Sequence, residues 1–129
     1  MANIDAKYNI ETVRGNVLPL RFRAKLNTDG TVQTFKPDDV VRFTIMQKGK
    51  CDQVVLQKDE TVKEECESIS MVIPAHEMKF GPIISTPVDY WYEVEVNPDT
   101  PYTVTILGYT KKKDGPKILT LLPEGGDKK

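Results

Sequence analysis

Residues 90–97 (YWYEVEVN) hold the side chains of this 129-residue sequence that are best suited to chemistry. Glu93 and Glu95 stand two positions apart, so on a β-strand they share one face with their Cβ atoms roughly 7 Å apart. That spacing suits the paired carboxylates of a glycosidase. The neighbouring sequence supplies no apolar pocket that would raise the pKa of one of them for acid catalysis. We therefore expect a solvated pair without a catalytic role.

The three aromatic residues of the same stretch offer a binding chemistry, because aromatic rings provide stiff contact area at a small entropic cost. Strand alternation places Tyr92 on one face with two valines, and Trp91 on the other face with the two glutamates. We expect Tyr92 in a core. The ring of Trp91 either covers the sheet or contacts a ligand. The possible contact residues are Trp91, Tyr90 and Tyr102.

No motif elsewhere in the sequence indicates an enzyme or a bound cofactor. There is no G-x-S-x-G turn, no P-loop and no dinucleotide glycine fingerprint, and the single histidine, His76, stands in no zinc-protease motif. We predict a non-enzymatic protein with no catalytic residues, no metal ligands and no cofactor. An unfamiliar site assembled from distant loops stays open as the alternative.

Two cysteines, Cys51 and Cys66, are the only thiols, and they form no CxxC pair. A hairpin about Lys58 and Asp59 would bring the two thiols face to face, where a disulfide could form. A reducing compartment disfavours that bond, since the first residues lack the pattern of a secretion signal. The cysteines and His76 match no zinc spacing, so we expect ordinary thiols and a surface histidine.

Composition narrows the choice of partners. The 18 basic and 19 acidic residues leave a net charge of −1, so no general field favours nucleic acid or an anionic membrane. The apolar runs are far shorter than a membrane span. We expect no nucleic-acid partner, no membrane partner and a location in the cytoplasm or in a particle assembled there.

Period-two alternation of apolar residues recurs along the chain, whereas no window of a dozen residues sustains a helical pattern. Short strands separated by turns favour an all-β sandwich of about seven to nine strands. We predict strands at residues 8–13, 17–26, 40–46, 51–57, 68–73, 90–97, 102–109 and 116–122.

The remaining segments are assigned from their turn residues and their charge. Residues 58–67 read as a solvated hairpin tip or edge, residues 74–82 as a helical turn, and residues 111–115 as a tight reversal into the last strand. We expect a flexible N-terminus at 1–7, a single domain at 8–122 and a disordered tail at 123–129.

Three strands show which side chains should form the core, because their apolar residues recur at every second position. The predicted core faces are Leu18, Leu20, Phe22 and Ala24; Val41, Phe43 and Ile45; and Ile69, Met71 and Ile73. Pro19 indicates an edge or the start of a strand, because proline cannot donate to a ladder.

The order of these pieces resembles a known family. A glycine-led turn at residues 14–16 precedes an alternating strand, Asp39-Val41-Phe43-Ile45 follows a D-x-V-x-F-x-V pattern, and Tyr90-Tyr92-Glu93-Val94 follows a late Y-x-Y-D/E-I/V pattern. TVTILGY then matches a closing T-I/V-x-x-G strand. Residues 11–125 are thus similar to the immunoglobulin-like module of phages and prophages of Gram-positive bacteria, found as the N-terminal domain of baseplate upper proteins.

The resemblance implies an immunoglobulin-like antiparallel β-sandwich and a structural or interaction role in the tail or baseplate of a particle. It implies no catalytic residues, other phage structural proteins as partners, and a homo-oligomer. The baseplate proteins continue into coiled-coil and receptor-binding regions that this sequence does not contain, so receptor attachment is not implied. A carbohydrate-binding module that uses the aromatic residues named above is the alternative, with a glycan as partner.

Overall fold

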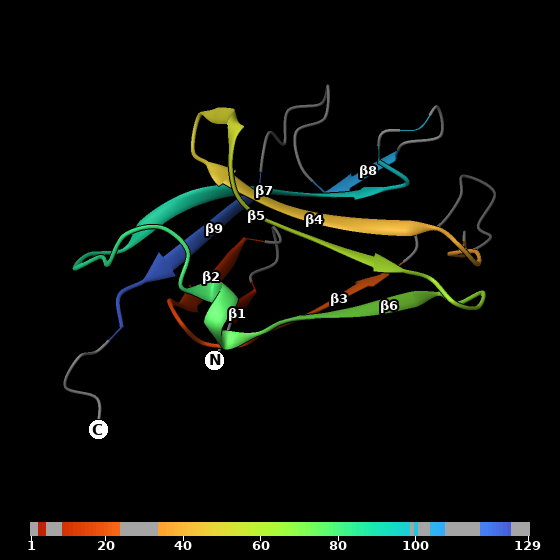
Figure 1. Ribbon diagram of the computed structural model, residues 1–129, viewed down its shortest axis with the longest axis horizontal. Helices are drawn as coiled ribbons and strands as arrows, with labels where there is room; N and C mark the ends of the chain where they lie inside the picture. The colour runs from red at the N-terminus through yellow and green to blue at the C-terminus, as the bar shows by residue number, and fades with distance from the viewer. Residues whose placement is uncertain are drawn as a thin grey trace.

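The computed structural model describes residues 3–4, 9–23, 34–98, 100, 104–107 and 117–124. In this part of the chain two β-sheets lie face to face, with one short helical turn beside them (Figure 1). The elements are β1 (Asn3–Ile4), β2 (Ile10–Val13), β3 (Leu18–Arg23), β4 (Val40–Gln47), β5 (Lys50–Thr61), β6 (Ser68–Ile73), the 3-10 helix η1 (Ala75–Met78), β7 (Val88–Val96), β8 (Val104–Leu107) and β9 (Lys117–Leu122).

The larger sheet has the strand order β1-β2-β9-β7-β4-β5, with β8 also paired to β7, and the smaller sheet consists of β3 and β6. The order β9-β7-β4-β5 corresponds to strands G-F-C-C′ of a variable-type immunoglobulin sheet, and β3-β6 corresponds to B-E. The predicted all-β sandwich is confirmed. One pair departs from the antiparallel pattern, because β2 runs parallel to β9.

The core lies between the two sheets and contains the side chains that strand alternation predicts. Phe43 stands at its centre, with its ring centroid 6.4 Å from that of Phe22 and 5.4 Å from that of Tyr92. The predicted core faces of β3, β4 and β6 are confirmed, with Ile69 only partly buried and Ala24 outside the described residues. Pro19 lies on β3, which forms an edge of the two-stranded sheet in the described part of the chain.

The last two strands, β8 and β9, lie along the same neighbour. Both pair antiparallel with β7, so they run in the same direction. Since β4 occupies one edge of β7 along residues 90–96, β8 and β9 share the other edge in tandem. The reversal predicted at residues 111–115 lies outside the described part of the chain.

β5 is longer than predicted. Its continuous course excludes the predicted hairpin about Lys58 and Asp59, which would have brought Cys51 and Cys66 face to face. Lys58 and Asp59 pair with Phe43 and Arg42 inside a continuous strand, so residues 58–61 form an edge strand. Cys66 is a free thiol whose backbone forms a bridge with Phe35 instead. The charged residues suit this position, because charge on an edge strand disfavours pairing with another chain.

Some described residues lie within the two terminal segments that were predicted to be flexible or disordered. Within the segment predicted to be flexible, Asn3–Ile4 forms a short strand on β2. Within the predicted tail, Glu124 accepts a hydrogen bond from Arg14. The helical turn predicted at residues 74–82 is present as η1. None of the described helices has the length and hydrophobicity to cross a membrane.

Candidate functional site

The outer face of the larger sheet, which is turned away from β3 and β6, carries the residues singled out for chemistry. Tyr92 and Val94 of β7 point into the core and are 2% and 0% exposed. Trp91, Glu93 and Glu95 alternate with them and lie on the outer face, where all three are half-buried. The predicted division of this strand into two faces is confirmed.

An apolar row crosses four strands of this outer face at the level of Trp91. Trp91 lies opposite Ile118 of β9 and Met46 of β4, and Met46 lies opposite Val54 of β5. Met46 is only 3% exposed although it alternates with the core residue Ile45, whereas Val54 is 49% exposed. Ile118, Trp91, Met46 and Val54 are called the apolar row below. It places apolar side chains on a sheet face that ordinarily carries polar ones.

The two glutamates lie next to the apolar row and interact with each other. Burial raises the pKa of Glu93, and the charge of Glu95 and a side-chain hydrogen bond with Glu95 raise it further. Thr44 and Arg42 of β4 lie opposite Glu93 and Glu95. The expectation of a simply solvated pair is therefore wrong for Glu93. Its burial comes from cross-strand neighbours, which the local sequence does not reveal.

The geometry of the glutamate pair does not suit glycoside cleavage. Retaining glycosidases hold their two carboxyl groups about 5–5.5 Å apart, with the scissile bond between them, and inverting enzymes hold them further apart. Glu93 and Glu95 instead act directly on each other from one strand, since the charge of Glu95 contributes to the raised pKa of Glu93. No group of three or more His, Cys, Asp or Glu residues is placed to hold a metal ion in the part of the chain that the structure describes.

Acidic residues predominate among the charged side chains of the outer face. Arg42 forms a two-point ion pair with Asp59, with distances of 2.8 and 3.0 Å. Asp89 accepts a hydrogen bond from Thr120 and lies 4.0 Å from Lys48. The described carboxylates of this face are Glu11, Asp59, Asp89, Glu93 and Glu95, and the described cations on or beside it are Arg42 and Lys48. Asp52 and Lys50 add one charge of each sign at the hairpin end of β5. The outer face of the larger sheet is thus an apolar row bordered by an excess of acid.

The other predicted contact residues are not part of this face. Tyr90 is 7% exposed and belongs to the core, where its ring packs edge-on against Phe80 at 5.2 Å. Its hydroxyl packs close to Gly81. A Cβ atom added at Gly81 would lie only 3.1 Å from the hydroxyl oxygen. The prediction that Tyr90 presents its ring to a ligand is wrong, since alternation places it on the side of Tyr92. Tyr102 lies outside the described residues.

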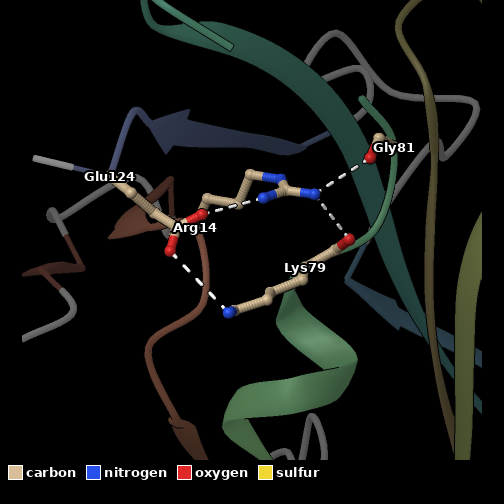
Figure 2. A network of polar contacts seen from close by, with 4 residues as sticks. All are labelled: Arg14, Lys79, Gly81 and Glu124. Atoms are coloured by element: carbon tan, nitrogen blue, oxygen red, sulfur yellow. Dashed lines mark hydrogen bonds and ion pairs between the residues drawn. The ribbon is translucent and has the colours of Figure 1, made fainter. Parts of the chain in front are cut away.

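A second polar region, which the sequence did not reveal, surrounds Arg14 at the turn between β2 and β3 (Figure 2). The Arg14 side chain is 8% exposed and donates hydrogen bonds to Oε1 of Glu124 at 2.8 Å, to the Lys79 carbonyl at 2.8 Å and to the Gly81 carbonyl at 3.1 Å. Glu124 also lies 4.0 Å from Nζ of Lys79. Arg14, Lys79, Gly81 and Glu124 are called the Arg14 corner below.

Backbone bonds hold the Arg14 corner together as well. The Arg14 N–H donates to the Leu122 carbonyl at 2.9 Å, and the Gly15 N–H donates to the Met78 carbonyl at 3.2 Å. Gly15 has a φ of +86°, a conformation that glycine adopts without strain. The corner therefore joins the β2–β3 turn, the segment after η1 and the end of β9. His76 of η1 lies nearby in the chain with its side chain 81% exposed, as predicted for a surface histidine.

Comparison of the chain with protein-family models, with curated proteins and with solved structures found no match. The features that bear on function are therefore the outer face and the Arg14 corner.

Proposed function

We propose that this chain is a non-enzymatic structural or protein-interaction module of a phage or prophage particle, associated with the tail or baseplate. The sequence pattern from the glycine-led turn at residues 14–16 to the tyrosine strand supports the assignment to a particle. The outer face of the larger sheet supports the interaction role. Other structural proteins of the particle are the expected partners.

The observation that carries the proposal is the apolar row with its acidic border. Trp91 belongs to a residue type that is enriched at protein interfaces, and aromatic anchors supply much of the binding energy there. Val54 leaves apolar area exposed to water in the same row. The core of the sandwich lies on the other side of the sheet, so packing of the core does not require this row. We expect the apolar row to contact a bound partner.

A test in particles separates the two parts of the proposal. Induced particles are purified on a density gradient and probed with an antibody against the chain, for the wild type, for Trp91→Ser and for Ile83→Ser. Ile83 is 86% exposed and lies outside the apolar row, so its substitution is a matched loss of an apolar side chain. We expect wild type and Ile83→Ser in the particles, and at least about a tenfold loss of Trp91→Ser.

Two results would count against the proposal. Absence of the wild-type chain from purified particles would overturn the assignment to a particle. Incorporation of a folded Trp91→Ser variant at the wild-type level would overturn the role of the outer face. Circular dichroism of each purified variant shows whether a loss of incorporation is only a loss of folding.

A carbohydrate-binding module is the second candidate, and the half-buried ring of Trp91 beside two carboxylates favours it. Stacking of a sugar on an aromatic face with polar groups at its border is a common arrangement for binding of a small ligand. Trp91 is the single tryptophan of the chain, so intrinsic tryptophan fluorescence reports on this position alone. Titration with bacterial cell-wall sugars should change the emission if this candidate is correct, and an unchanged spectrum removes it.

A further inference from the structure

The outer face of the smaller sheet differs in charge from that of the larger sheet. Strand register places Pro19, Arg21, Ser68, Ser70 and Val72 on it. Arg21 is exposed and donates to Oγ of Ser68 at 3.1 and 3.0 Å. Among the described side chains of this face there is one guanidinium and no carboxylate.

The same face exposes apolar side chains in one place. Val72 is 56% exposed and lies opposite Pro19, which is also exposed. Val17, just before β3, is 49% exposed and stands two positions from Pro19. Val17, Pro19, Arg21 and Val72 are called the Arg21 patch below. The patch combines a cation with apolar area, whereas the outer face of the larger sheet combines an excess of acid with apolar area.

We infer that the partner of the acidic outer face is a second copy of this chain, which binds through its Arg21 patch. This inference rests on the proposed interaction role and adds the identity of one partner. Charge complementarity supports this contact, because Arg21 of one copy would meet Glu93 and Glu95 of the next copy, on a face where acidic residues are in excess. The apolar row would meet Val17, Pro19 and Val72.

The alternative pairing of two acidic outer faces with each other is disfavoured by the same charges. A two-fold contact would place Glu93, Glu95 and Asp89 of one copy against the acidic face of the other, and like charges across an interface cost several kcal/mol. Half-buried Glu93 would lose still more of its contact with water there. The charge distribution therefore selects unlike faces over like faces.

The position of the two faces determines the kind of assembly. The larger and the smaller sheet form opposite layers of the sandwich, so their outer faces point away from each other (Figure 1). A contact between them is head-to-tail, and the dimer that it forms keeps one free face of each kind. Such contacts generate rings or open chains and do not stop at a dimer. Growth beyond the dimer therefore distinguishes this contact from a two-fold one.

Sedimentation velocity over a range of protein concentrations at low and high salt tests the inference. We expect species larger than a dimer at low salt, dispersed by high salt because the contact joins opposite charges. Arg21→Glu should weaken association at least about tenfold, and so should the double variant Glu93→Lys with Glu95→Lys. The three substitutions combined in one chain should restore association, because both faces then change sign. Lys63→Glu, an exposed position on neither face, is the matched control and should leave association unchanged.

Each other outcome overturns the inference. A wild-type chain that stays monomeric at every concentration would do so, as would association that stops at a dimer or a combined variant that fails to associate although it is folded. The particle experiment keeps the two proposals apart. Incorporation that depends on Trp91, by a chain that is monomeric in solution, would leave the proposed function in place and remove only the self-association.

Discussion

The Arg14 corner and the outer face of the larger sheet both withdraw charge from water, but they do so in opposite ways. In the corner, Arg14 meets a carboxylate and two carbonyl groups, each within 3.1 Å. On the outer face, Glu93 is half-buried beside a second glutamate, and its pKa is raised. Charge in the corner is hydrogen-bonded to acceptors, whereas ionised Glu93 lies beside a like charge. The difference fits the proposed interaction role of the outer face.

The largest expected effect comes from the corner. Arg14→Ala should lower the free energy of unfolding by about 3 kcal/mol, because it removes the partner of Glu124 and the donor for two carbonyl groups in a region that is mostly buried. Urea unfolding followed by circular dichroism measures the change. Arg14→Lys is the control and should recover only part of the loss, since one ammonium group cannot reach all three acceptors. If Arg14→Ala lowers the free energy of unfolding by less than about 1 kcal/mol, the Arg14 corner contributes no more to stability than the outer face does.

A smaller loss is expected at Trp91. Trp91→Ala should lower the free energy of unfolding by about 1 kcal/mol, because the ring covers the sheet but fills no core position. Tyr92→Ala is the matched control on the next residue of the same strand and should cost about 3 kcal/mol through lost burial and cavity formation. Equal losses in urea unfolding would show that Trp91 belongs to the fold as much as Tyr92 does.

The smallest effect is a gain of stability. Since the pKa of Glu93 is higher in the folded chain than in the unfolded chain, its ionisation favours unfolding, and stability falls as the pH rises from the ordinary value of 4.5 through the raised one. Glu93→Gln should remove that loss and raise the free energy of unfolding at neutral pH by about 0.5 kcal/mol.

Unfolding curves of wild type and Glu93→Gln between pH 4 and pH 7 measure this difference. The two should converge toward the acid end of the range and separate toward neutral pH. A variant that is less stable than wild type at pH 7 would show that the carboxylate of Glu93 is used by the fold, as Arg14 is.

The sequence predicts the core well and the polar regions poorly, for a physical reason. Alternation is a local property of a strand, so the burial of Phe43 and Tyr92 can be read from their own segments. The burial of Glu93 depends on the neighbouring strand, where Thr44 lies opposite it, and the contact between Arg14 and Glu124 joins residues 110 positions apart. Neither leaves a local pattern.

The tandem arrangement of β8 and β9 along β7 escapes sequence reasoning for the same reason. A segment rich in lysine and glycine between two apolar strands reads as a reversal whether the strands form a hairpin or continue in tandem along one neighbour. The tandem arrangement depends on β7, because β4 covers one of its edges and leaves the other edge for both β8 and β9. The continuous β5 is a similar case, because its charged end pairs with β4 through the Arg42–Asp59 ion pair.

One measurement tests most directly whether the outer face serves binding and not folding. Urea unfolding and sedimentation velocity are run on a variant that combines Trp91→Ser, Glu93→Gln and Glu95→Gln, beside Arg14→Ala. We predict that the outer-face variant unfolds within about 1 kcal/mol of the wild type and no longer associates. A loss of stability as large as that of Arg14→Ala, or association at the wild-type level, would contradict this prediction.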